Sequence, residues 1–139
     1  MILDARSLKS LEGVHPDLVK VVTLAAANTD TPFIVTEGLR TLERQKKLLA
    51  AGASKTLRSR HLTGHAIDVA AYLDLDGDGE KDPAEQIRWD WPLYHKIAAS
   101  MKDAGLRLGI PIEWGGDWRS FKDGPHFQLP WERYPTDDN

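Results

Sequence analysis

Two short stretches of the chain combine histidine with aspartate, residue types that bind catalytic metal ions in proteins. The first stretch contains His61 and Asp68, and the second contains Asp123 and His126. The chain has no cysteine, so any metal ion must be bound by His, Asp, Glu or carbonyl oxygen. A catalytic zinc ion usually takes three protein ligands and leaves a further position to water. Three of these four side chains would complete such a site.

A turn is required between His61 and Asp68 if both are to bind one ion. Their spacing separates the two Cα atoms by about 23 Å in a straight strand and by about 10 Å in a helix, too far for ligands of one ion. Thr63 and Gly64 provide the turn. His65 lies an odd number of strand positions from Asp68, so its side chain points to the opposite face. We expect a structural or supporting role for His65.

The third ligand is expected in the segment 123–129. Alternation along this segment sends Phe127 to the core and His126 to the polar side of a strand. Asp123 lies three residues before His126, where its carboxylate could reach a metal-bound water rather than the ion, as a general base does. Glu113 is the alternative base, and it lacks this place before a ligand histidine.

The elements that must position these residues are a mixture of helices and strands. Apolar residues at helical spacing, together with capping and stop residues, predict three helices, at 16–28, 41–52 and 92–105. Alternation predicts strands at 33–36 and 65–73, and two more within 110–129, with a loop at 53–64. Regular strand–helix–strand alternation is absent. The fold class is therefore α+β: one small catalytic domain, residues 1–139, in which an antiparallel sheet carries the zinc site and packs with about three helices.

Composition and charge narrow the class of protein further. The 139 residues are 41% hydrophobic and 28% charged, as in ordinary globular domains. The formal charge of -3 argues against nucleic acid as a partner. Apolar runs of membrane-spanning length are absent, and charged residues interrupt the N-terminal segment where a signal peptide would need an apolar core. We expect a monomer that is made in the cytoplasm without a signal peptide and does not insert into membranes.

A second ion, calcium, is expected in an acidic loop after residue 73. The carboxylates of this loop follow the ligand spacing of an EF-hand. The candidate ligands are Asp74, Asp76, Asp78, Glu80, Asp82 and Glu85. Lys81 stands where a hydrophobic residue is usual, and the preceding segment is predicted as a strand. We therefore expect an EF-like loop between strand and helix, with a solvated acidic turn as the alternative.

The two histidine-containing motifs together resemble a known family. The segment SRHLTGHAID, residues 59–68, fits the Ser-x-His-x-x-Gly-x-Ala-x-Asp pattern of the zinc D-alanyl-D-alanine carboxypeptidases and L-alanyl-D-glutamate endopeptidases, which cut peptidoglycan stem peptides. The segment WGGDWRSFKDGPHFQ, residues 114–128, is similar to the second motif of the endopeptidase branch, found in phage endolysins and bacterial cell-wall hydrolases. The two motifs occur in the expected order, and the resemblance covers most of the chain.

Carried over by position, the resemblance implies a role for five residues. His61, Asp68 and His126 are implied as zinc ligands, and Asp123 as the acid/base that takes a proton from water and delivers it to the leaving amine. Arg40, in a Gly-Leu-Arg-Thr segment, is implied as a cation facing the carboxylates of the substrate.

The leading hypothesis is a zinc metallopeptidase that hydrolyses the L-Ala–D-Glu bond of peptidoglycan stem peptides. It would act on the wall after release through a separate membrane pore, if phage-encoded, and calcium would raise its activity. A D-alanyl-D-alanine carboxypeptidase with the same zinc site is the first alternative; the Trp-Gly-Gly-Asp-Trp motif and the aspartate base argue against it. A non-catalytic wall-binding or calcium-binding module is the second. Trp114 and Trp118 fit a groove wall or the core equally well, and His15 and His95 receive no role.

Overall fold

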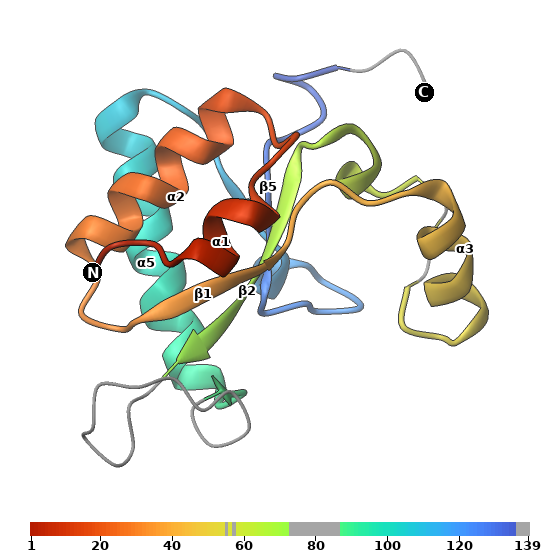
Figure 1. Cartoon of the computed structure of the whole chain (residues 1–139), viewed down its shortest axis with the longest axis horizontal. Helices are drawn as coiled ribbons and strands as arrows, with labels where there is room; N and C mark the ends of the chain where they lie inside the picture. The colour runs from red at the N-terminus through yellow and green to blue at the C-terminus, as the bar shows by residue number, and fades with distance from the viewer. Residues whose placement is uncertain (55, 57, 73–86, 136–139) are drawn as a thin grey trace.

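The computed structural model describes residues 1–54, 56, 58–72 and 87–135 of the chain (Figure 1). Helices and strands alternate irregularly along it. In chain order they are α1 (Ala5–Ser10), α2 (Pro16–Asn28), β1 (Phe33–Glu37), α3 (Leu42–Ala50), the 3-10 helix η1 (Arg60–Thr63), β2 (Ala66–Tyr72), β3 (Ile87–Arg88), α5 (Trp91–Leu108), β4 (Glu113–Trp114), the 3-10 helix η2 (Gly115–Asp117) and β5 (His126–Gln128).

The strands form one antiparallel sheet with β2 near its middle. The order is β1-β2-β5-β4, and β3 pairs with the far end of β2. Asp68 on β2 pairs with Glu37 on β1 and with His126 on β5. Directly paired residues in a sheet point to the same face, so this register brings the side chains of Asp68 and His126 together.

The two faces of β2 have different roles. Ile67, Val69 and Ala71 point into the hydrophobic core, where α2 and α5 pack against each other and cover one face of the sheet (Figure 1). Asp68 alternates with them and points to the other face. α3 stands apart from α2 and α5, beyond the end of β1 (Figure 1). The predicted α+β class and antiparallel sheet are confirmed.

The predicted helices are present, with one boundary placed wrongly. Leu18, Val21 and Val22 of α2 are fully buried, as their helical spacing predicted. α5 continues past Gly105, which was predicted as its stop. A Cβ at Gly105 would lie 2.6 Å from the carbonyl oxygen of Ile110, so glycine serves close packing inside the helix, and Gly109 at φ 70° ends the helix instead. No helix in the described part of the chain is long and apolar enough to cross a membrane.

Four short elements were not predicted: α1, η1, β3 and η2. α1 begins at the cap Asp4, and its buried Ser7 accepts a hydrogen bond from the backbone N–H of Val35 on β1 at 2.9 Å. η1 occupies part of the stretch predicted as a loop. Elements of two to six residues are too short to display a periodic apolar pattern, so the sequence carries little signal for them.

Candidate metal centre

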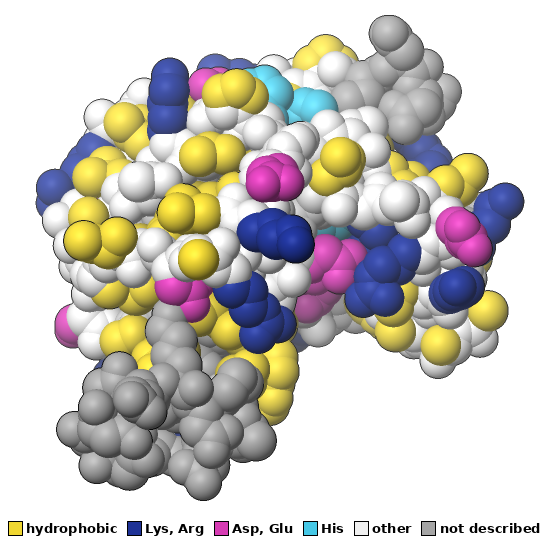
Figure 2. Space-filling model, in the orientation of Figure 1, with side chains coloured by type: hydrophobic (Ala, Val, Ile, Leu, Met, Phe, Trp, Pro, Cys, Tyr) yellow, Lys and Arg dark blue, Asp and Glu magenta, His cyan; other side chains and the backbone are white. Residues whose placement is uncertain are grey.

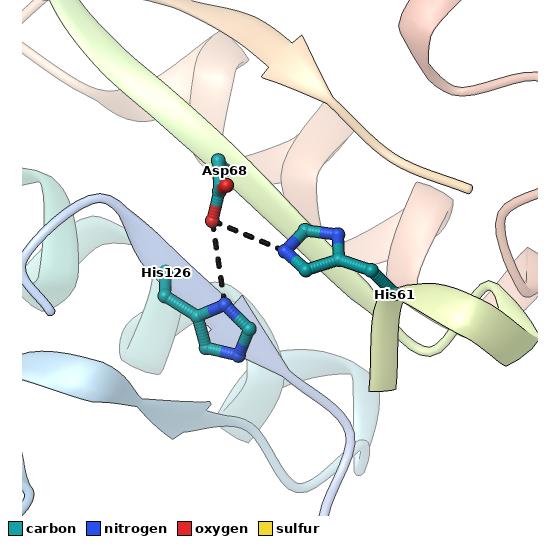
Figure 3. Close-up of side chains that lie close together, drawn as sticks. All are labelled: His61, Asp68 and His126. Carbon is teal, nitrogen blue, oxygen red and sulfur yellow. Dashed lines mark hydrogen bonds and ion pairs between the residues drawn. The ribbon is translucent and has the colours of Figure 1, made fainter. Parts of the chain in front are cut away.

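The side chains of His61, Asp68 and His126 converge on one point (Figure 3). One potential ligand atom from each lies within 4.8 Å of the others. Asp68 Oδ1 is 3.2 Å from His61 Nε2 and 3.3 Å from His126 Nδ1. Two imidazole nitrogens and one carboxylate oxygen are a common donor set for catalytic zinc, with room left for water and substrate. The residues present therefore fit a zinc ion.

The turn between His61 and Asp68 is made by η1 and Gly64. Gly64 adopts φ 78°, a left-handed conformation that favours glycine. A Cβ at this position would also lie only 2.3 Å from the carbonyl oxygen of Gly13. The predicted turn is confirmed, and its sharpness explains how two residues so close in sequence face each other.

Each ligand histidine is oriented by a hydrogen bond on its far nitrogen. His61 Nδ1 lies 2.8 Å from the carbonyl oxygen of Gly38, which accepts its N–H and leaves Nε2 facing Asp68. His126 Nε2 lies 2.7 Å from Gln128 Oε1, which leaves Nδ1 facing Asp68. Such partners fix the ring tautomer and orientation. The centre thus presents Nε2 of one histidine and Nδ1 of the other.

The charges of the centre stabilise one another. Burial raises the pKa of Asp68, but its contacts with His126 and His61 outweigh burial and hold its pKa far below the usual range. Burial lowers the pKa of His126, and the contacts with Asp68 and Gln128 outweigh it, so the pKa of His126 is raised. Asp68 is therefore ionised at neutral pH, as the binding of a metal ion by its carboxylate would require.

Asp123 lies beside this group on the loop before β5. Its backbone N–H donates to the carbonyl of Gly115 at 3.0 Å, and its carbonyl accepts from the N–H of His126 at 3.2 Å. A Cβ at Gly115 would lie 2.4 Å from the Asp123 carbonyl oxygen, so only glycine permits this approach. Burial and the charge of Asp68 raise the pKa of Asp123, in spite of the neighbouring histidines and arginine. A carboxylate with a raised pKa next to a metal centre can act as acid and base.

Glu113 and the two motif tryptophans have distinct places. Glu113 Oε1 accepts the indole N–H of Trp118 at 3.0 Å, and the Trp118 ring packs against His126 with centroids 5.1 Å apart. Both Glu113 and Trp118 line the cleft described below. Trp114 is buried, and its indole N–H donates to the carbonyl of Gly124 at 2.7 Å. Trp118 is thus the groove residue of the pair, and Trp114 belongs to the core.

Arg40 is anchored between β1 and α3, next to the centre. Its guanidinium is hydrogen-bonded to Glu37, to Gln45 Oε1 at 2.7 Å and to Asp68 Oδ2 at 3.5 Å. Burial raises the pKa of Glu37, but its bonds with Arg40 and Arg44 outweigh burial and lower it. The structure therefore places Arg40 against a ligand carboxylate, with an acidic partner of its own.

An open cleft of about 610 Å³ passes over the centre. Its lining includes Arg40, His61, Asp68, Asp123 and His126. Figure 2 shows basic and acidic side chains gathered in the middle of this face, between the sheet and α3. A cleft of this size exceeds the volume of a dipeptide, so it can accept groups on both sides of a scissile bond.

Several groups lie away from the centre. His65 has its ring 5.2 Å from that of His15, and its Nδ1 lies 2.7 Å from Thr63 Oγ1, so it is not part of the ligand group. His15 caps α2 by accepting the backbone N–H of Asp17. The expected calcium ligands, Asp74, Asp76, Asp78, Glu80, Asp82 and Glu85, lie outside the described residues, and the calcium loop stays a prediction.

Sequence reasoning missed the residues that orient the ligands. Gly38 acts through its backbone carbonyl, for which the sequence carries no signal. Gln128 lies two residues after His126, and strand alternation places both on one face, so its contact with the ring was accessible from the pattern. Gln45, the residue of α3 that is buried, was not singled out because its partners come from outside the helix.

The fold and the centre together define a small α+β protein with a candidate metal site, His61, Asp68 and His126, in an open cleft. Residues 1–129 match the family model described as phage L-alanyl-D-glutamate peptidase, and the chain belongs to this family. The resemblance seen in the two sequence motifs is thereby confirmed.

Individual relatives agree with the family assignment. The chain is 31% identical over 121 residues to the L-alanyl-D-glutamate peptidase of Escherichia phage T5, covering 84% of this chain and 81% of that protein. It is 35% identical over 109 residues to the L-alanyl-D-glutamate peptidase of Listeria phage A118; the match covers 75% of this chain but spans only 32% of that protein's length.

Solved structures share the fold. The L-Ala D-Glu endopeptidase ChiX of Serratia marcescens is 48% identical, with a TM-score of 0.84 and coverage of 98% of this chain and 95% of that one. The vancomycin resistance D,D-dipeptidase VanXYg, in complex with a D-Ala-D-Ala phosphinate analogue, is 21% identical with a TM-score of 0.50, covering 84% and 50%. The latter likeness concerns the fold alone.

Proposed function

We propose that this protein is a zinc-dependent endopeptidase that hydrolyses the L-Ala–D-Glu bond of peptidoglycan stem peptides, as a phage endolysin or cell-wall hydrolase. The observation that carries the proposal is the convergence of His61, Asp68 and His126 beside Asp123, in a chain of this family. The names of ChiX and of the phage T5 protein support the choice of bond. We further propose a monomeric, single catalytic domain whose partner is the stem peptide in the wall.

The ligand set and Asp123 divide the chemistry between them. Zinc held by His61, Asp68 and His126 would act as a Lewis acid: it would polarise the scissile carbonyl and lower the pKa of a water molecule. Asp123 takes a proton from the water molecule as the water oxygen attacks the carbonyl carbon. It then delivers this proton to the leaving nitrogen as the C–N bond breaks. The raised pKa of Asp123 suits both halves of this transfer.

Arg40 stabilises negative charge at the reacting centre in this mechanism. Its guanidinium lines the cleft and lies 3.5 Å from Asp68 Oδ2, next to the ligand group. A permanent positive charge held in place by Glu37 and Gln45 costs little reorganisation when the substrate carboxylate or the developing oxyanion arrives. Trp118 packs against the His126 ring and forms part of the cleft wall on that side.

One digestion experiment tests the function against both alternatives. Purified peptidoglycan is incubated with zinc-loaded protein, and the new termini are identified by mass spectrometry. New N-terminal D-Glu supports the endopeptidase. Release of free D-Ala would instead identify a D-alanyl-D-alanine carboxypeptidase, and absence of products would leave a non-catalytic wall-binding module. The Asp123→Asn variant, run in parallel, shows whether any products depend on the proposed acid/base.

A further inference from the structure

The cleft has two chemically different ends, with the metal centre between them. At the β1 edge its lining includes Arg40 and Arg44, both hydrogen-bonded to Glu37 of β1. At the other edge it includes the exposed aromatic rings of Trp89 and Phe121. Cationic side chains at one end and uncharged aromatic rings at the other indicate that the two halves of the substrate differ in charge.

The sheet topology shows which end carries Trp89. Ala71 on β2 pairs with Phe33 of β1 on one edge and with Arg88 of β3 on the other. Continuing this register puts Trp89, the residue after Arg88, beside Ala70, two positions from Asp68 and on the same face of β2. Trp89 therefore stands about 7 Å along the strand from the ligand Asp68, on the side of the sheet away from β1.

The Trp89 ring is exposed to solvent but is held in place by a neighbouring ring. It is 63% exposed, although tryptophan is usually well buried. It stacks on Tyr94 with centroids 6.1 Å apart and an interplanar angle of 2°. Tyr94 is itself held rigidly: its hydroxyl donates to the carbonyl of Arg88 at 2.7 Å and accepts the N–H of Ala71 at 3.0 Å. The Trp89 ring is thus preorganised at the cleft without being buried in the core.

The proposed substrate has the same asymmetry as the cleft. In peptidoglycan the amino group of L-Ala is joined to the lactyl group of N-acetylmuramic acid, whereas the D-Glu that follows carries a free carboxylate. Guanidinium groups suit the carboxylate side. The uncharged C–H face of a sugar ring suits an exposed aromatic face.

We propose that Trp89 forms a subsite for the N-acetylmuramic acid sugar next to the scissile bond, so that the protein prefers stem peptides still attached to the glycan. This inference rests on the proposed function and adds the direction in which the substrate lies: the sugar toward β3 and D-Glu toward α3.

The test compares two substrates that share one peptide. One carries N-acetylmuramic acid on L-Ala, and the other carries a simple acetyl group. The zinc-loaded wild-type protein should show a kcat/KM ratio of about five to ten in favour of the sugar-bearing substrate, the size of one aromatic contact. Trp89→Ala should bring this ratio close to one, and Trp89→Phe should restore most of it. Thermal unfolding checks that both variants fold.

A second exposed tryptophan supplies the matched control. Trp91 is 45% exposed and lies outside the cleft lining, so Trp91→Ala should keep the wild-type ratio. An unchanged ratio in Trp89→Ala, or a wild-type ratio near one, would overturn the sugar subsite and leave the endopeptidase standing. Failure of the wild-type protein to cut either substrate between L-Ala and D-Glu would overturn the proposed function itself, and the subsite with it.

Discussion

His126 and Gln128 lie side by side on the face of β5 that lines the cleft, with His126 Nε2 2.7 Å from Gln128 Oε1. If the amide were turned over, its NH2 would donate to Nε2 and put the ring proton on Nδ1, the nitrogen that faces Asp68. The amide oxygen therefore keeps Nδ1 available as a ligand. Gln128 is a positioning residue for the metal centre, and its effect should appear in metal binding itself.

We expect Gln128→Leu to weaken zinc binding by about 10-fold to 100-fold, because the His126 ring loses the partner that fixes its tautomer. Gln128→Glu keeps an acceptor oxygen at the same place and should retain most of the affinity. Competition with a chromophoric chelator measures both variants without reference to activity. Equal affinities of wild type and Gln128→Leu would show that the contact is dispensable.

Asp123→Asn should retain zinc while kcat falls by about 100-fold to 10,000-fold, because an amide cannot accept and return the proton. Metal content by atomic emission and hydrolysis of a stem peptide provide the two readouts. Glu113→Gln is the comparison, since Glu113 also lines the cleft but is hydrogen-bonded to Trp118. A larger loss of kcat in Glu113→Gln would identify Glu113, rather than Asp123, as the acid/base. Loss of zinc from Asp123→Asn would instead identify Asp123 as a metal ligand.

The convergence of the three candidate ligands, His61, Asp68 and His126, was predictable because its signals are local. A turn at Gly64 and strand alternation at Asp68 and His126 are enough to aim three side chains at one face, and the structure brings all three within 4.8 Å. The supporting contacts depend on the sheet register instead. Asp68 pairs with Glu37 and His126 only because β1 and β5 flank β2 in this alignment, and a sequence does not state which strands are neighbours.

The dependence on tertiary structure also explains why the contacts of Arg40 and Gly105 were not predicted from the sequence. Arg40 was predicted only as a cation for the substrate, whereas its anchoring depends on the tertiary structure, which places Glu37 of β1 and Gln45 of α3 on either side of its guanidinium. Gly105 looked like a helix stop because glycine commonly follows a helix. Its actual reason, the approach of the Ile110 carbonyl, lies in tertiary structure and leaves no local pattern.

Glu37 should make folding stability depend on pH in the acid range. The pKa of Glu37 in the folded protein is below its ordinary value of 4.5, so its ionised form stabilises the fold above that pH, and this contribution is lost as the pH falls through the folded pKa. Glu37→Gln should therefore lower the free energy of unfolding at pH 7 and differ little from wild type at strongly acid pH. Urea unfolding of chelator-treated protein at several pH values measures this, and a constant difference would contradict it.

The acidic loop sequence still predicts a calcium effect. If Asp74, Asp76 and their neighbours bind calcium, ordering the loop should steady β2, since the loop begins six residues after Asp68. Peptidase activity of the zinc-loaded protein should then rise on addition of calcium, and Asp76→Ala should abolish the rise. A calorimetric titration with calcium provides an independent readout. Activity and heat that do not respond in the wild type would identify a solvated acidic turn.

Gly64→Ala should disrupt the turn that joins the two halves of the first motif. Alanine pays about 1–2 kcal/mol to adopt φ 78°, and its Cβ would also stand 2.3 Å from the Gly13 carbonyl oxygen. Gly52 is the matched control, because it has the same φ of 78° but nothing within 4 Å of the added Cβ. Gly52→Ala should thus show the backbone cost alone in urea unfolding, whereas Gly64→Ala should lose more stability and also bind zinc more weakly, as η1 carries His61. Equal losses of stability in the two variants would mean that the Gly13 segment shifts to accommodate the added Cβ. The close approach of Gly13 to Gly64 would then not be what stabilises the turn.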